Sequence, residues 1–266
     1  MLDRSPDPNH ANPFMPTRQL PFTYPLTNLA AALRNPPAPV KIIAIGSSST
    51  AGRGTTVLPY PYRLEAFLRD YYKDKIPADP NRIINVINRG KGGEDAPEEL
   101  KRLDRDVLEE KPVMVIWQVG TNAAFKSENL TDVRHAIAAG LDRLKAQERD
   151  ILLMDPQYVP ALIWPDTFRQ RAEEVQGLIR EAADAAQVNL FGRYELMRAW
   201  HQHEKIPLDN LVDPDDPDRL HQSDWSTRRV AWELWNLMTR SVDELWKKAD
   251  VAAAAKSNPS QSPPSS

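Results

Sequence analysis

Short apolar runs alternate with stretches of helical periodicity along most of this chain. Five runs rich in Ile and Val show no polar alternation, at residues 40–45, 83–87, 113–119, 151–154 and 188–191. A strand in a parallel sheet is covered by helices on both faces, so it is apolar throughout. These runs are therefore predicted to be strands of a parallel sheet.

Helical patterns occupy the intervals between the runs. Leu64, Phe67 and Leu68 repeat at the spacing of one helical face. Asp95 and Glu98 form a capping-box pattern before another apolar stripe. Regular alternation of strands and helices predicts an α/β sandwich, in which ligands bind beyond the carboxyl ends of the strands.

Composition excludes several classes of function. The net charge is −3 and the pI is about 6.0, so the chain has no overall basic charge for nucleic acid or an acidic membrane. The absence of cysteine excludes disulfides and thiolate metal sites. No apolar run approaches the ~20 residues of a membrane helix. We expect a monomer without a transmembrane segment that binds no nucleic acid.

Both ends of the chain differ in composition from the middle. Residues 1–39 hold nine of the 24 prolines and are predicted to be an extended lead-in with a short helix at "TNLAAALR". Residues 40–248 form the expected domain, and residues 249–266 are predicted to be a disordered, low-complexity tail. The N-terminus has neither a basic nor an apolar segment of a signal peptide, which leaves the compartment open.

The first predicted strand ends in three consecutive serines, Ser47, Ser48 and Ser49. This segment is not a phosphate loop, because no lysine follows at the required position, and it lacks the GxGxxG of a dinucleotide site. It also departs from the GxSxG nucleophile elbow, since Thr50 stands at the last glycine. The remaining alternatives are a serine nucleophile and a polar turn that caps the next helix.

A serine nucleophile needs a base, and the base needs an acceptor that orients it. His221 lies in the turn-rich segment "DPDRLHQSDW", three residues after Asp218. A turn of this size lets the Asp218 carboxylate reach Nδ1 of His221 and leaves Nε2 free for a serine. His201 and His203 lie in a helix-like stretch, where residues two apart face different sides, so they make a poor metal pair.

Four segments, in order, resemble the four sequence blocks of the SGNH (GDSL-type) hydrolases. They are "IGSSSTAG", "NRGKGGEDA", "GTN" and "DRLH". The resemblance extends from about residue 40 to residue 245. It implies a three-layer α/β/α sandwich with a five-stranded parallel sheet, flavodoxin-like in its arrangement. It also implies a serine esterase that needs no metal and no organic cofactor.

The resemblance assigns roles to individual residues. Ser48 corresponds to the nucleophile, His221 to the base and Asp218 to the residue that orients the base. The backbone N–H groups of Ser48 and Gly93 and the side-chain amide of Asn122 correspond to the oxyanion hole. The chain departs from the family pattern at Ser47, which stands where the family usually has aspartate.

The substrate is less well defined by the sequence. The resemblance implies an acyl ester, small or on a glycan, and is compatible with an exported protein. The loop after the fourth predicted strand places Tyr158 and Trp164 where they could line the cleft. Two alternatives stay open, namely an inactive glycan- or acyl-binding module on the same fold and a nucleotide-binding α/β domain. Asn88 weakens the second, because it replaces the acidic residue that binds ribose.

Among the three serines, only Ser48 is predicted to carry the acyl group. Ser48→Ala should lower kcat about 10⁶-fold, as the loss of a triad nucleophile does. Ser47→Ala and Ser49→Ala should keep most of the activity. Mass spectrometry of the protein labelled with a serine-directed phosphonate identifies the residue, and a label on either neighbour would refute this assignment.

Overall fold

The computed structural model describes residues 21–35, 39–53, 56–76 and 83–257. Its five parallel strands are β1 (Val40–Gly46), β2 (Ile84–Gly90), β3 (Met114–Gln118), β4 (Asp150–Met154) and β5 (Asn189–Phe191). They form one sheet in the order β2-β1-β3-β4-β5. The predicted five-stranded parallel sheet is therefore confirmed.

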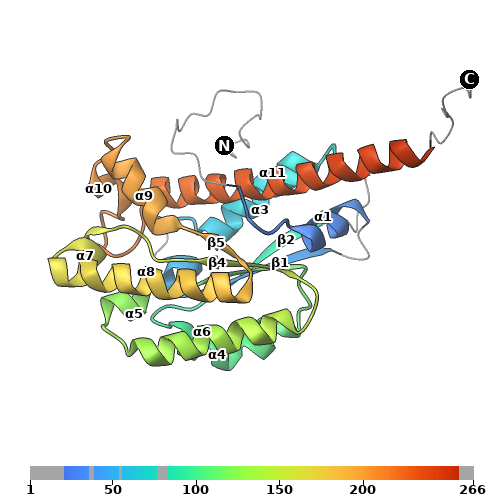
Figure 1. The fold of residues 1–266 in the computed structure, drawn as a ribbon. Helices are drawn as coiled ribbons and strands as arrows, with labels where there is room; N and C mark the ends of the chain where they lie inside the picture. The colour runs from blue at the N-terminus through green and yellow to red at the C-terminus, as the bar shows by residue number, and fades with distance from the viewer. Residues whose placement is uncertain (1–20, 36–38, 54–55, 77–82, 258–266) are drawn as a thin grey trace, which may run out of the picture.

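Helices cover both faces of the sheet and make three layers (Figure 1). One face carries α1 (Thr27–Arg34), α3 (Tyr60–Tyr72) and α11 (Asp224–Ser257). The other carries α4 (Ala96–Leu103), α6 (Leu130–Lys145) and α8 (Asp166–Ala186). The remaining helical segments are η1 (Asp104–Leu108), α2 (Ser48–Ala51), α5 (Thr121–Phe125), α7 (Pro160–Ile163), α9 (Arg193–Gln202) and α10 (Leu208–Leu211).

Trp117 of β3 joins the sheet to α4 and α6. Its side chain is fully buried, and its indole Nε1 donates to Glu99 Oε2 at 2.7 Å. A Cβ at Gly140 of α6 would come within 2.2 Å of the indole ring, so glycine lets the helix lie directly on it. Asp95 begins α4 with the predicted capping box. Helices α4 and α6 are therefore both held against the sheet through Trp117.

The lead-in to β1 is part of the folded domain. The sequence predicts the helix α1, but it does not predict that Leu26, Leu29 and Leu33 lie in the core. The carboxylate of Asp150, at the start of β4, accepts from the Leu29 backbone N–H at 2.8 Å. A domain boundary at residue 40 is therefore too late. Residues 1–20 of the predicted lead-in lie outside the described residues.

The C-terminal prediction is wrong for residues 249–257. These residues continue α11 to Ser257 instead of forming a disordered tail. Their alanines, residues 252–255, have the highest helix propensity, so the helix extends although Val251 is 63% exposed. Residues 258–266 of the predicted tail lie outside the described residues. No helix among those that are described has the length and apolar character needed to cross a membrane.

Truncating the buried leucines of α1 should destabilise the whole domain. Leu29→Ala and Leu33→Ala should each lower the free energy of unfolding by about 2–5 kcal/mol, because each leaves a cavity in the core. Leu58→Ala, at a side chain that is 47% exposed, is the control and should change it by less than about 0.5 kcal/mol. Urea unfolding measures the difference, and equal effects at the three sites would contradict the docking of α1.

Candidate active site

The serine cluster begins where β1 ends. Gly46 is the last residue of the strand, and Ser48 is the first residue of the short helix α2. The backbone N–H groups of Thr50 and Ala51 donate to Ser47 O at 3.0 and 2.9 Å. A Cβ on Gly46 would come within 2.5 Å of Thr50 Oγ1, so the turn needs glycine there. The turn brings Ser48 to the carboxyl edge of the sheet.

A neutral amide contacts Ser47, the residue before the predicted nucleophile. Ser47 is 1% exposed, and its N–H and Oγ donate to Gln118 Oε1 at 3.1 and 3.0 Å. Thr50 Oγ1 donates to the same oxygen at 3.3 Å. Gln118 ends β3, the neighbour of β1. The side-chain oxygen of Gln118 thus positions the turn from one side.

The end of β2 holds the turn from the other side. Asn88 Nδ2 donates to Thr50 O at 2.8 Å, and Asn88 Oδ1 accepts from the Gly90 N–H at 2.9 Å. A Cβ on Gly90 would come within 2.1 Å of the Ala51 nitrogen. Asn88, which stands where a ribose-binding acid was expected, therefore binds the backbone of the serine turn.

His221 joins Ser48 to an aspartate, but that aspartate is Asp216. His221 Nε2 lies 2.9 Å from Ser48 Oγ, and His221 Nδ1 lies 2.8 Å from Asp216 Oδ2. The prediction of Asp218 at this position is wrong. The chain turns around the buried Asp216 carboxylate, whereas Asp218 is exposed. Arg219 adopts a left-handed backbone conformation (φ 54°) within this turn.

The Asp216 carboxylate has several hydrogen-bond donors although it is fully buried. Oδ2 also accepts from the backbone N–H groups of Leu220 and His221 at 2.9 and 2.7 Å. Oδ1 forms an ion pair with the Arg53 guanidinium. Hydrogen bonds and an opposite charge both favour the ionised form of a carboxylate. Asp216 is therefore suited to remain an acceptor for the imidazole.

The surroundings of His221 favour the neutral imidazole. Burial lowers the pKa of His221, and the positive charge of Arg53 lowers it further. The negative charges of Asp218 and Asp213 act in the opposite direction but do not outweigh these effects. Arg53 Nη1 lies 3.2 Å from His221 Nδ1. A histidine with a lowered pKa is available as a base over a wider pH range.

The two other predicted oxyanion donors lie in the loops after β2 and β3. Gly93 has φ +80°, and a Cβ on its neighbour Gly92 would be 3.8 Å from Ser48 Cβ, so this loop borders the serine. Asn122 is 4% exposed, and its Nδ2 donates to Glu94 O at 2.7 Å. That bond uses one of the two amide hydrogens, which leaves the other for a ligand.

The two aromatic residues predicted to bind substrate do not line the pocket beside Ser48. Tyr158 is buried, and its ring packs edge-on against Tyr194 with centroids 5.1 Å apart, so the prediction for Tyr158 is wrong. Trp164 is 57% exposed and lies beside the Arg219 guanidinium. The pocket is lined instead by Ser48, Ser49, Gly52, Arg53, Val57, Pro59, Asp213, His221, Gln222 and Thr227.

A buried polar network below the site has no signature in the sequence. Gln157 Oε1 accepts from Ser49 Oγ, Thr121 Oγ1 and Arg193 Nη2 at 3.1, 3.0 and 2.8 Å. Arg193 is fully buried, and burial lowers its pKa to about 10, which leaves it charged near neutral pH. Its Nη1 donates to Gln222 Oε1 at 3.2 Å. This network connects the serine turn to the segment after His221.

Comparisons with known proteins identify the family of the chain. Residues 14–244 match a family described as non-GDSL lipase-like. No curated protein sequence matches the chain.

The chain also resembles solved structures. A lipolytic protein of the G-D-S-L family from Desulfitobacterium hafniense DCB-2 superposes with a TM-score of 0.58 at 19% identity, over 74% of this chain and 99% of that one. A lipase/acylhydrolase from Enterococcus faecalis superposes with a TM-score of 0.58 at 23% identity, over 74% of this chain and 93% of that one. An acetylxylan esterase from Geobacillus stearothermophilus superposes with a TM-score of 0.59 at 18% identity, over 76% of this chain and 93% of that one. At these identities the likeness establishes the fold.

Separate substitutions of the two aspartates should distinguish their roles. Asp216→Asn should lower kcat about 10⁴-fold, because His221 then loses the acceptor that holds its tautomer. Asp218→Asn should change kcat less than about threefold, since that side chain is exposed and makes only a Coulombic contribution at His221. Steady-state kinetics on one ester substrate measures both. A larger loss for Asp218→Asn would restore the original assignment.

Proposed function

Since the chain belongs to the non-GDSL lipase-like family, its reaction class is carboxylic ester hydrolysis, and we propose that Ser48, His221 and Asp216 carry out this reaction. The observation that carries the proposal is the continuous contact from Ser48 Oγ through the imidazole to the Asp216 carboxylate. In this arrangement Ser48 is the nucleophile, His221 the general base and Asp216 the residue that orients the base.

Acylation begins when neutral His221 takes the proton of Ser48 Oγ at Nε2. The Ser48 oxygen attacks the ester carbonyl carbon, and a tetrahedral oxyanion forms. As it collapses, the bond from carbon to the alcohol oxygen breaks, and Nε2 gives its proton to the leaving alcohol. Asp216 stabilises the transient imidazolium and takes up no proton.

Deacylation repeats these steps with water as the nucleophile. His221 takes a proton from water, whose oxygen attacks the acyl carbon, and then returns the proton to Ser48 Oγ as the carboxylic acid leaves. The Ser48 and Gly93 N–H groups and the free amide hydrogen of Asn122 are the proposed donors to the oxyanion. Donors held in position before the reaction are worth about 10²–10³ each in kcat.

The proposed substrate class is a short-chain acyl ester, with an acetylated carbohydrate as the first candidate. Val57 and Pro59 are the apolar side chains among the pocket-lining residues, which suits an acyl group of few carbons. The acetylxylan esterase that shares the fold bears the name of an enzyme acting on an acetylated glycan, which supports testing that class first.

A chain-length series of p-nitrophenyl esters, followed by a panel of acetylated sugars, tests the activity and the substrate class. We expect kcat/KM to be highest for acetate and to fall with chain length. Ser48→Ala is the control for non-enzymatic hydrolysis. A preference for octanoate or longer would overturn the short-chain assignment. Folded protein with no hydrolysis and no labelling by a serine-directed phosphonate would instead indicate an inactive binding module.

The pH dependence of the activity should change when the positive charge of Arg53 is removed, because this charge lowers the pKa of His221. Activity requires neutral His221, so it is present above the pKa of His221 and lost as pH falls through that value. Because the pKa is lowered, the midpoint in kcat/KM should lie below about 6.5. Arg53→Gln removes a positive charge beside the imidazole and should move the midpoint to higher pH. Arg63→Gln is the control, since Arg63 pairs with Asp224, and should not move it.

A further inference from the structure

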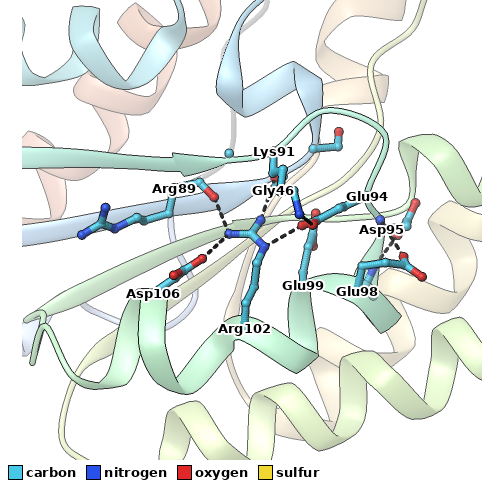
Figure 2. Close-up of polar contacts among 12 residues, drawn as sticks. Gly46, Arg89, Lys91, Glu94, Asp95, Glu98, Glu99, Arg102 and Asp106 are labelled. Atoms are coloured by element: carbon cyan, nitrogen blue, oxygen red, sulfur yellow. Dashed lines mark hydrogen bonds and ion pairs between the residues drawn. The ribbon is translucent and has the colours of Figure 1, made fainter.

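One buried arginine connects the two loops that hold the proposed oxyanion donors. Arg102 lies near the end of α4 and is 8% exposed. Figure 2 shows its guanidinium below the ends of β1 and β2. It donates to four acceptors, two of which are the carboxylates of Glu94 (Nε to Oε2, 2.6 Å) and Asp106 (Nη1 to Oδ2, 2.9 Å). The other two are the backbone carbonyls of Arg89 (2.7 Å) and Gly46 (3.2 Å).

The Gly46 contact leads to the nucleophile. Gly46 O accepts from Arg102 Nη2 and also from the Lys91 N–H at 2.8 Å. This carbonyl belongs to the peptide that joins Gly46 to Ser47, immediately before Ser48. Since the two donors fix the orientation of that peptide, they also fix the start of the turn that presents the Ser48 N–H.

The Glu94 contact leads to the other donors. Glu94 directly follows Gly93, and Glu94 O accepts from Asn122 Nδ2 at 2.7 Å. Lys91 Nζ lies 2.8 Å from Glu94 Oε1, so both carboxylate oxygens are held. Burial raises the pKa of Glu94, but hydrogen bonds from Lys91 and Arg102 lower it more, and the carboxylate stays ionised. Anchoring this side chain anchors the backbone beside Gly93 and the carbonyl that orients Asn122.

Helix α4 does not depend on Arg102 alone for its place on the sheet. The capping box of Asp95 and Glu98 holds its first turn, and Glu99 binds the Trp117 indole. Burial and the charge of Asp95 raise the pKa of Glu99 well above its ordinary value, which disfavours the ionised form. Arg102 forms ion pairs with Glu94 and Asp106. Of these two residues, Glu94 also contacts a proposed oxyanion donor, because its backbone carbonyl accepts from Asn122.

We propose that Arg102 and Glu94 are positioning residues for the oxyanion hole. They hold the Ser48 N–H at the distance from the Gly93 N–H and the Asn122 amide that a tetrahedral oxyanion requires. The inference rests on the proposed function. Neither residue is among those that line the pocket beside Ser48. Their effect acts through the three donors, so it is largest where the donors matter most, in the transition state.

Conservative variants of the pair, measured against matched controls, test this role. Arg102→Lys keeps the charge but cannot reach four acceptors from one planar group. Glu94→Gln keeps the length of the side chain and weakens the contact with Arg102. Each should lower kcat about 10–100-fold and change KM less than twofold. Arg149→Lys, at a buried arginine just before β4, and Glu110→Gln, at partly buried ion pairs with Lys41 and Arg89, should leave both constants unchanged.

A double-mutant cycle separates positioning from general destabilisation. Asn122→Ala alone should lower kcat about 10²–10³-fold. If Arg102 acts through the oxyanion donors, Arg102→Lys added to Asn122→Ala should cost less than it does in the wild type. Full additivity, or a rise in KM at constant kcat, would overturn the inference. If Arg102→Lys fails to fold by circular dichroism, Glu94→Gln decides, and wild-type kinetics in that variant would overturn it.

The wild type distinguishes the failure of this inference from the failure of the proposed function. Ester hydrolysis and phosphonate labelling of Ser48 in the wild type, with wild-type kcat in folded Arg102→Lys and Glu94→Gln, would overturn the positioning role alone. A folded wild type that neither hydrolyses esters nor takes the label would overturn the proposed function and, with it, the inference.

Discussion

The parallel sheet is the constraint on which the rest of this structure depends. Because all five strands run in one direction, their carboxyl ends meet at one edge, and β1 lies between β2 and β3. The serine turn that follows β1 is therefore held from both sides. Asn88 binds it from β2, and Gln118 binds it from β3. Ser48 is presented at this edge because the turn that contains it is held by Asn88 and Gln118, which lie 40 and 70 residues further along the chain.

Buried charge near the site is balanced group by group. Asp216 has backbone donors, an imidazole and a guanidinium, while Arg102 has two carboxylates and two carbonyls. Removing a charge from water costs several kcal/mol, and only a nearly complete set of partners offsets this cost. A side chain with this many partners is held in one orientation. The same contacts that make the buried charges tolerable thus hold the proposed base and the proposed oxyanion donors in place before any substrate arrives.

A serine at position 47 fits this arrangement. The Ser47 hydroxyl donates to Gln118 Oε1, which also accepts from the Ser47 N–H and from Thr50. An ionised carboxylate at position 47 could not donate to Gln118 Oε1 as the Ser47 hydroxyl does. The neutral serine and the neutral amide are therefore complementary, and the turn is positioned without a charge at that point. The Arg53 guanidinium lies on the other side of the imidazole, with Nη1 3.2 Å from His221 Nδ1.

The sequence by itself determined the five strands, the helices between them and the contact of Ser48 with His221. The strands and helices follow from local apolar patterns, whereas Ser48 and His221 are paired through the resemblance of four short motifs to a known family. The tertiary structure decided the rest. Asp216 lies five residues before His221, and its selection over Asp218 depends on how a turn coils around a buried carboxylate. Arg53 pairs with Asp216 and Arg102 donates to the Gly46 carbonyl, and both partners are distant in sequence, so no local spacing specifies these contacts.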